Sequence, residues 1–340
     1  MGVDIGSLFE KEKISYKDLH DRIIAIDAHN VLHQFLSIIR GRDGSPLKDS
    51  HGRITSHLSG ILYRTSNLIE ARIKPVFIFD GEPDLLKEKT ILDRKRRKIK
   101  AEKEYKEALE KGDLAKARSK ASQTSKVTEE IIEQSMELLD ALGIPYMSAP
   151  SEGEAQASYM VKKNDVYAAG SQDFDCLLLG APVLVRNLTS SSRRKLPGKK
   201  AYVKVHPEII RLKPNLKKLG ISHRQLVDMG ILIGTDFNEG IKGIGPKKSL
   251  KLIKNNGNAE NALAKIGSDD APTFEEIKEI RKLFLEPKVT DDYSLEWKAA
   301  DEDKVIEILC DKHQFSEKRI KSTLEKFENM ETIVKQKTLF

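Results

Sequence analysis

The sequence predicts an α/β protein whose core is a mostly parallel, twisted sheet with helices on both faces. Short apolar runs, among them Ile23–Ile26 and Val76–Phe79, alternate with stretches of helical periodicity, which is the pattern of βα units. Several of these runs end in an acidic residue. Hydrophobic residues make up 39% of the 340 residues, which is enough for a sizeable core. The length suggests about two domains of roughly 150 residues each, or one extended α/β domain.

The first hundred residues read as strand, helix and strand. A helix is expected at 56–72, between the two strands that end at Asp27 and Asp80. From 84 to about 132, Lys and Arg crowd a helical pattern that lacks a continuous apolar stripe, so this stretch cannot pack as an ordinary core helix. Gly112 interrupts it, and a second polar helix is expected through Val127. The stretch is either a solvated pair of charged helices or, because it starts directly after Asp80, an element that embraces a strand of substrate.

The alternation of helices and strands resumes after this insertion. Gly143 ends an amphipathic helix, and a basic, Ser-rich loop at 189–200 separates two strands without a role that its residues define. The helices expected here are 129–142 and 154–163, and the strands are 144–147, 182–185 and 202–205.

The charge balance favours a polyanionic partner. The formal net charge is +7 and the pI is near 9.0, yet acidic residues gather at the predicted strand ends, so the positive charge must lie elsewhere. Taken alone, a net charge is explained equally well by ordinary solubility. Two cysteines, Cys176 and Cys310, give no disulfide framework, and the sequence shows no cleavable signal or apolar stretch of spanning length. We therefore expect a soluble, intracellular protein.

Seven acidic residues stand where apolar runs end or helices begin. Because a parallel sheet gathers the ends of its strands at one edge, these carboxylates can converge on one pocket. So many negative charges stay ionised together only beside cations, and oxygen-only ligands favour magnesium or manganese. The sequence therefore predicts a two-metal site for phosphoryl transfer, formed by Asp27, Asp80, Glu152, Glu154, Asp173, Asp175 and Asp236.

Two of these residues also have structural explanations. Asp80 precedes Gly81, and Asp-Gly is a common turn. Ser151 and Glu154 have the spacing of a capping box, in which Glu154 would bond the backbone at the helix start. Capping does not account for three apolar runs that end in Asp together with an Asp-x-Asp and a Glu-x-Glu pair. The metal site is therefore the preferred interpretation of the group.

A glycine-rich turn at 240–250 predicts a second functional surface. Its glycines allow tight turning and present N–H groups, and Pro246 suits a first helical turn. Lys247 and Lys248 add positive charge at that helix start. Such an element holds a phosphate without reading a base. Asp236 lies just upstream, so duplex binding is expected close to a metal ligand.

Motifs in a fixed order along nearly the whole chain resemble those of the flap endonucleases, which belong to the structure-specific 5′ nuclease superfamily. They are Met1-Gly2-Val3, Asp27-Ala28-His29-Asn30, Phe79–Pro83, Glu152–Ala157, Gln172–Asp175, Gly230–Pro246 and Leu283–Pro287. The lack of a long basic C-terminal extension is similar to the archaeal type. The resemblance implies a PIN-like 5′ nuclease core that cuts 5′ flaps, with 5′–3′ exonuclease activity, in Okazaki fragment processing and in repair.

The resemblance also implies roles for individual residues. The first four of the seven carboxylates correspond to ligands of one Mg²⁺, and the last three to ligands of a second, partly through water, with Mn²⁺ able to substitute. Lys87 and Arg94 correspond to a basic pair on the first helix of an arch, so the catalytic set is Lys87, Arg94, Asp173 and Glu152. His33 stands where many relatives have a base-stacking tyrosine. The residues expected to contact DNA are Gly2, His33, Arg40, Thr55, Arg64, Gly234, Gly243, Gly245, Lys247 and Lys248. Some members of the family hold K⁺ at the glycine-rich turn.

By the same resemblance the chain divides into regions with separate tasks. A sliding clamp is an expected partner, through a tail motif that keeps Gln336, Leu339 and Phe340 but lacks a second aromatic residue. The expected enzyme is a monomer that acts on branched DNA, cytoplasmic if it is of the archaeal type and nuclear if it is eukaryotic. The regions are an N-terminal nuclease region at 1–98, a helical arch at 84–132, an internal nuclease region at 116–258 with a helix-two-turn-helix near 226–256, a C-terminal helical region at 259–329 and the clamp tail at 330–340.

Two other functions stay open. A 5′ exonuclease or a bubble- or gap-cutting endonuclease of the same superfamily would share the carboxylates, although the modest arch and short C-terminal end favour the flap enzyme. A non-catalytic DNA-binding scaffold, whose acidic pocket merely holds ions, is the alternative from another class.

Overall fold

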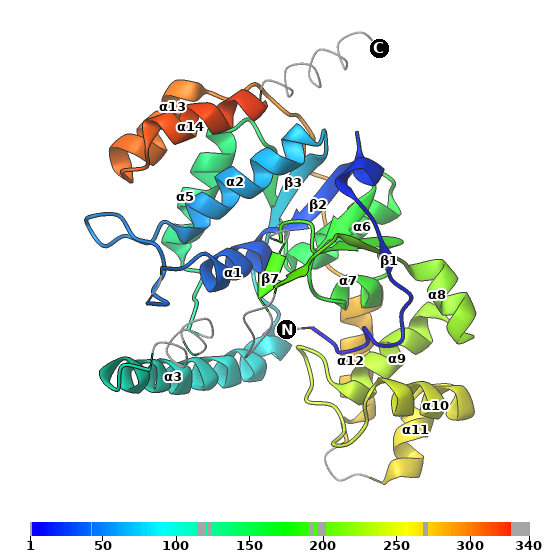
Figure 1. The fold of residues 1–340 in the computed structure, drawn as a ribbon. Coiled ribbons are helices and arrows are strands. Elements are labelled where there is room, and N and C mark those ends of the chain that lie inside the picture. Colours follow the sequence, from blue (N-terminus) through cyan, green and yellow to red (C-terminus); the bar gives the residue numbers. More distant parts are fainter. Residues whose placement is uncertain are drawn as a thin grey trace.

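A sheet of seven strands forms the centre of the protein (Figure 1). The computed structural model describes residues 2–41, 43–113, 120, 124–190, 193–195, 202–267 and 271–327. Within these residues the strand order is β1-β9-β6-β5-β2-β3-β4. The bounds are β1 (Glu12–Lys13), β2 (Ile23–Asp27), β3 (Lys74–Phe79), β4 (Tyr146–Ser148), β5 (Ala168–Gly170), β6 (Val183–Arg186) and β9 (Glu208–Arg211).

The predicted mostly parallel sheet is confirmed, because five consecutive strands are parallel. The pairs β6-β5, β5-β2, β2-β3 and β3-β4 are all parallel. The remaining edge is antiparallel, since β9 joins β6 antiparallel and β1 joins β9 antiparallel. The two residues of β1 are both exposed and carry no apolar signal. The expected strand at 202–205 forms as β8 (Tyr202–Lys204), but it pairs with β7 (Arg193–Lys195) in a separate two-stranded sheet.

Helices cover both faces of the sheet, as predicted (Figure 1). Neighbouring residues of β2 point in opposite directions, so Ala25 lies in one apolar core while Ile24 and Ile26 lie in the other. The first core contains α6 (Gly153–Lys162), α7 (Asp175–Leu178) and α9 (His223–Ile233). The second contains α1 (Ala28–Ile38), α2 (Ser56–Glu70), α5 (Glu129–Ala141), α13 (Glu302–Ile306), the π-helix η3 (Glu307–Lys312), α14 (Glu317–Leu324) and η4 (Glu325–Phe327).

The basic stretch after β3 folds as a long helix that lies apart from those on the sheet (Figure 1). It begins with η2 (Leu85–Lys87) and continues as α3 (Glu88–Glu110). The second polar helix does not reach Val127 as expected, because residues 125–128 are not helical. Thr128 there is extended and caps α5 by accepting a hydrogen bond from the Ile131 amide at 3.3 Å. Residues 114–119 and 121–123 of this stretch lie outside the described residues.

A lobe of helices extends the first core away from the sheet (Figure 1). It contains α9, α10 (Pro246–Asn256), α11 (Ala259–Ile266) and α12 (Phe274–Leu285), with α8 (Leu212–Leu219) nearby. Arg281 of α12 ties the lobe together, because its guanidinium lies 2.7 Å from Asp228 of α9 and 2.8 Å from Glu260 of α11. No helix in the described residues is long and apolar enough to cross a membrane.

Candidate active site

The ends of three neighbouring strands bring the predicted carboxylates to one edge of the sheet. Asp27 of β2 lies opposite Ile78 of β3, and Ile26 lies opposite Gly170 of β5. Because these strands are parallel, Asp27, Asp80 and the segment 171–175 leave the sheet on the same side. The prediction that separate apolar runs converge through their terminal acidic residues is therefore confirmed in its geometry.

Asp27 is the most central of these carboxylates. It caps α1, accepting a hydrogen bond from the Asn30 amide at 3.0 Å, and only 6% of the residue is exposed. Burial, and next the charge of Asp80, raise the pKa of Asp27 to about 8. A carboxyl in such a place releases its proton readily only when a cation comes close.

Asp80 is held by a backbone amide and by a histidine side chain. Its Oδ1 accepts a hydrogen bond from the Gly153 amide at 2.7 Å, and its own amide donates to Nδ1 of His29 at 3.1 Å. A Cβ at position 153 would lie 2.9 Å from the carbonyl oxygen of Ile78, so glycine permits this close approach. The turn explanation for Asp80 does not account for these long-range contacts.

The capping-box explanation of Glu154 is wrong. Glu152, and not Ser151, is the N-cap of α6, and no side chain caps that helix. Glu154 instead accepts a hydrogen bond from Oγ of Ser171 at 2.6 Å, across the sheet edge. Burial, and then the charge of Asp27, hold the pKa of Glu154 well above its usual range. Its carboxylate therefore belongs to the site.

The Asp-x-Asp pair lies on the segment after β5. The side-chain nitrogen Nδ2 of Asn30 donates to Oδ2 of Asp173 at 2.9 Å, and the Val3 backbone amide donates to Oδ1 of Asp175 at 2.8 Å. A Cβ at Gly2 would lie 2.5 Å from the Asp175 carboxylate, so the N-terminal segment touches the site through a glycine. Burial raises the pKa of Asp175 to about 7, although the Val3 amide opposes the shift.

A cation from the basic stretch already lies among the carboxylates. Nζ of Lys87 contacts Glu152 and lies 3.8 Å from Oδ2 of Asp236. Burial is the largest single influence and lowers the pKa of Lys87, but the charge and hydrogen bond of Glu152 together with the charges of Asp236 and Asp80 outweigh it, so the pKa of Lys87 is raised. Arg94 lies on α3, and its side chain is outside the described part of the structure.

The donor set fits hard divalent cations. It consists of carboxylate oxygens, several of them buried with raised pKa values because of burial and mutual repulsion. No three His, Cys, Asp or Glu side chains in the described residues are already closed around one metal position. Each carboxylate is instead held by an amide, a hydroxyl or Lys87, so metal binding would exchange or reorient some of these contacts.

Several residues that hold the carboxylates were not singled out from the sequence. His29 and Asn30 follow Asp27 on α1, and Ser171 precedes Asp173 by two positions. Arg186 of β6 also supports the Asp-x-Asp segment, because Nε donates to the Gln172 carbonyl at 3.0 Å and the guanidinium lies 4.3 Å from the Phe174 ring centre. Proximity to the motif was the only available signal, since neutral side chains and a distant arginine have no characteristic spacing.

The residues around α1 and α2 that are expected to contact DNA differ in their exposure and in their present partners. Arg40 donates to the carbonyls of Leu36 and Gly44 at 2.7 and 2.8 Å, so the structure places its guanidinium in local backbone contacts. Thr55 precedes α2 and is buried, whereas His33 on α1 and Arg64 on α2 are half-buried.

The glycine-rich turn connects α9 to α10 as predicted. Gly234 has a φ of 109°, and a Cβ there would lie 2.7 Å from the Glu239 carbonyl. At Gly243 and Gly245 no atom lies within 4 Å of such a Cβ, so this part of the turn is open. Lys247 and Lys248 are exposed at the start of α10, and Nζ of Lys248 donates to the Gly243 carbonyl at 2.9 Å. The tail residues Gln336, Leu339 and Phe340 lie outside the described residues.

Comparison with known proteins agrees with this geometry. The XPG N-terminal domain matches residues 5–103, and the XPG I-region matches residues 143–236. The chain is 51% identical over 340 residues to flap endonuclease 1 of Pyrococcus abyssi, covering 100% of this chain and 97% of the relative. It is 50% identical over 332 residues to the Archaeoglobus fulgidus protein of the same name, covering 98% and 97%.

Solved structures give the same result. Flap endonuclease-1 from Methanococcus jannaschii superimposes with a TM-score of 0.77 at 44% identity, covering 99% of this chain and 100% of that one. The catalytic core of Rad2 in complex with a DNA substrate shares the fold, with a TM-score of 0.69 at 23% identity over 95% of this chain and 97% of that one. The chain therefore belongs to the flap endonuclease 1 family, whose members are metal-dependent, structure-specific nucleases that hydrolyse DNA.

Proposed function

We propose that this chain cuts DNA near the junction between a duplex and a 5′ single-stranded flap, with an accompanying 5′–3′ exonuclease activity, in replication and repair. The observation that carries the proposal is the gathering of Asp27, Glu154 and Asp175 at one sheet edge with raised pKa values. A pocket of this kind attracts cations rather than a negatively charged substrate alone. The full-length similarity to flap endonucleases supports the choice of substrate.

Two divalent cations, Mg²⁺ or Mn²⁺, fit this site. Bound together, they would supply an activated water and stabilise the charge on the leaving 3′ oxygen. The products would be a 5′-phosphate and a 3′-hydroxyl. We assign Asp27, Asp80, Glu152 and Glu154 to one cation, and Asp173, Asp175 and Asp236 to the other.

Lys87 and Arg94 would act on the substrate phosphate from the arch at 84–132. Lys87 is favourably placed, since it already lies between Glu152 and Asp236. From there its ammonium can move to a phosphate oxygen and offset the charge that develops in the transition state. The arch would admit the 5′ single strand, which explains why a free end distinguishes the substrate.

The turn between α9 and α10 would grip the duplex. Gly243 and Gly245 are open, and Lys247 and Lys248 follow them at a helix start, which suits a backbone phosphate. K⁺ at this turn would be held by backbone carbonyl oxygens and not by the lysines. Gly2, His33, Arg40, Thr55, Arg64 and Gly234 complete the proposed DNA-contacting set. Arg40 would have to exchange its backbone partners for phosphate.

The test is a comparison of end-labelled 5′-flap, gap, bubble and blunt-duplex substrates, with Mg²⁺ and with EDTA. We expect Mg²⁺-dependent cleavage that is fastest on the 5′ flap. Faster cutting of bubbles or of blunt ends would favour the related repair endonuclease or exonuclease. Asp173→Asn is the control: cleavage should fall more than about 100-fold, since even a residue that only orients a metal ligand typically costs 10–100-fold. Flap binding should persist, and unchanged cleavage by this variant would refute the metal assignment.

A further inference from the structure

We propose that Asn30 and Ser171 form a neutral bridge that fixes the spacing between the carboxylates of the two metal positions. The inference rests on the proposed two-metal site, and it assigns to these side chains a positioning role toward the metals rather than a contact with DNA. We call this pair of residues the neutral bridge.

Ser171 connects two carboxylates of one metal position to the loop of the other. Its Oγ donates to Oε1 of Glu154 at 2.6 Å and lies 3.5 Å from Oδ2 of Asp27. The same oxygen accepts a hydrogen bond from the Asp173 amide at 3.2 Å. Since Ser171 is only 4% exposed, solvent cannot easily replace these contacts.

Asn30 makes a parallel set of contacts from α1. Its backbone amide donates to Oδ1 of Asp27 at 3.0 Å, while its side-chain nitrogen donates to Oδ2 of Asp173 at 2.9 Å. The side-chain oxygen accepts a hydrogen bond from the Gln172 amide at 3.3 Å. One residue therefore links a carboxylate of the first metal position to a carboxylate of the second.

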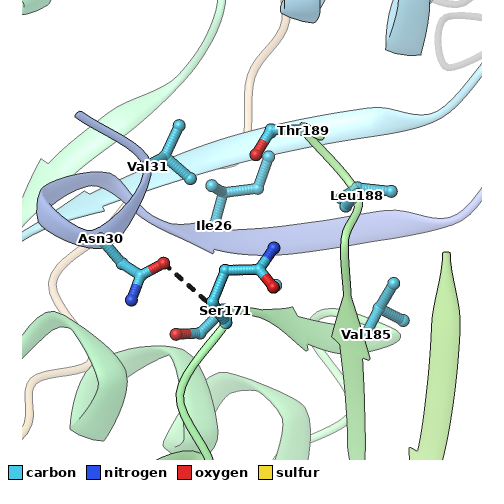
Figure 2. A pocket seen from close by; sticks show the side chains of 9 residues that line it. Ile26, Asn30, Val31, Ser171, Val185, Leu188 and Thr189 are labelled. Atoms are coloured by element: carbon cyan, nitrogen blue, oxygen red, sulfur yellow. Dashed lines mark hydrogen bonds between the residues drawn. The ribbon is translucent and has the colours of Figure 1, made fainter. Parts of the chain in front are cut away.

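The surroundings keep the bridge in place. Asn30 and Ser171 approach each other from α1 and from the segment after β5, and the Asn30 hydrogen bond to that segment closes the gap between them (Figure 2). Behind them lies a cavity of about 10 Å³, lined largely by Ile26, Val31, Val185 and Leu188. A cavity of this size barely holds one water molecule, so it gives the side chains little room to swing away.

Neutral groups are the appropriate chemistry for this place. A carboxylate in place of Asn30 or Ser171 would add to the negative charge of the site, which is already unfavourable. A lysine there would compete with the metal ions for the carboxylates. An amide and a hydroxyl donate hydrogen bonds to carboxylate lone pairs that point away from a metal, and thereby orient the pairs that point toward it. The bridge then restricts the distance between the two metal positions, which governs an in-line displacement.

The experiment measures Mn²⁺ binding to the full chain without DNA, by calorimetry and by the Mn²⁺ electron paramagnetic resonance spectrum. Ser171→Ala and Asn30→Ala should each weaken Mn²⁺ binding by about 10- to 100-fold. Ser171→Thr keeps the hydroxyl and should restore binding. Thr189→Val is the matched control, because Thr189 lines the same cavity but its hydroxyl donates to the side-chain oxygen of Gln34 and not to a carboxylate. Thermal melting in EDTA checks that each variant is folded.

Cleavage provides a second readout. For the two alanine variants the Mg²⁺ concentration that gives half-maximal flap cleavage should rise by the same factor, with most of the rate recovered at saturating Mg²⁺. Unchanged Mn²⁺ affinity in both variants would overturn the bridge, and so would an equal loss in Thr189→Val. If Mn²⁺ binding changes among the variants as predicted but the wild type cuts no flap, the proposed function is refuted and the bridge is still supported.

Discussion

Buried carboxylates at the sheet edge make the stability of the metal-free protein depend on pH. Asp27 and Asp175 have pKa values raised to about 8 and about 7, mainly by burial. An unfolded Asp titrates near about 3.9, so between that pH and the raised values the folded state binds more protons than the unfolded state. Stability must then fall as the pH rises through this window. Above about pH 8 this contribution is constant.

We expect the melting temperature in EDTA to fall between pH 5 and pH 8. Each pH unit costs at most about 1.4 kcal/mol per group, or roughly 2 °C for a chain of this size. Asp27→Asn keeps an oxygen to cap α1, so in EDTA it should be more stable than the wild type, by a margin that grows with pH. Mg²⁺ should raise the wild-type melting temperature more at pH 8 than at pH 5. Calorimetric scans in both conditions provide the measurement, and a margin that shrinks with pH would contradict the assigned shift.

At the scale of single residues, the sequence predicts which carboxylates meet but not what holds them. Asp27, Asp80 and Asp173 could be placed because an acidic residue after an apolar run leaves a parallel sheet at a known edge. Glu154 could not be separated from a helix cap by spacing, since only its contact with Ser171 decides the matter. His29, Asn30 and Ser171 are too ordinary in sequence to reveal contacts that depend on strand register.

At the scale of elements, η2 brings the positive charge of Lys87 to the acidic edge. Lys87→Ala and Arg94→Ala should each slow single-turnover flap cleavage by about 100-fold or more, with a smaller change in the dissociation constant, because their benefit lies mainly in the transition state. Lys103→Ala is the control, since Lys103 is exposed on the same helix. Quench-flow kinetics with separate binding assays measure both quantities. A loss of affinity without a loss of rate would make these residues ordinary phosphate contacts.

The start of α10 gives a prediction about salt. Lys247→Ala combined with Lys248→Ala should weaken binding to flap and plain duplex alike. Each lost phosphate contact should lower the slope of log affinity against log salt by about 0.9. Lys265→Ala, an exposed lysine on α11, serves as the control and should leave the slope intact. Fluorescence anisotropy across a salt series is sufficient, and an unaltered slope in the double variant would place the duplex grip elsewhere.

Helices with a strong hydrophobic periodicity were predictable from the sequence. Strands that form only by pairing with a segment far away in the sequence were not. The expected helices at 56–72, 129–142 and 154–163 match α2, α5 and α6 closely, because their apolar faces repeat along the sequence. The antiparallel edge of β1 and β9 was missed, since two exposed residues acquire strand structure only by pairing across the chain. The helix expected through Val127 does not extend that far, because residues 125–128 are not helical and Thr128 caps α5.

At the scale of the whole molecule, we predict that residues 336–340 attach the enzyme to a sliding clamp. Gln336 and Leu339 keep the spacing of a docking motif, and Phe340 adds an aromatic anchor. Deleting the five residues should leave flap cleavage by the isolated enzyme unchanged but abolish its stimulation by the cognate clamp. Equal stimulation of both forms would remove this role, and a lower melting temperature after deletion would show that the tail folds back onto the protein.

The carboxylates of the site lie far apart in the sequence, and this affects when the site can form during synthesis of the chain. Asp27 belongs to an early strand, whereas Asp236 follows α9, and the N-terminal strand β1 pairs only with β9 among the described residues. A nascent chain must therefore extend beyond residue 236 and leave the ribosome before its acidic edge is complete. Translation that stops earlier releases a fragment with several of the carboxylates but no assembled centre.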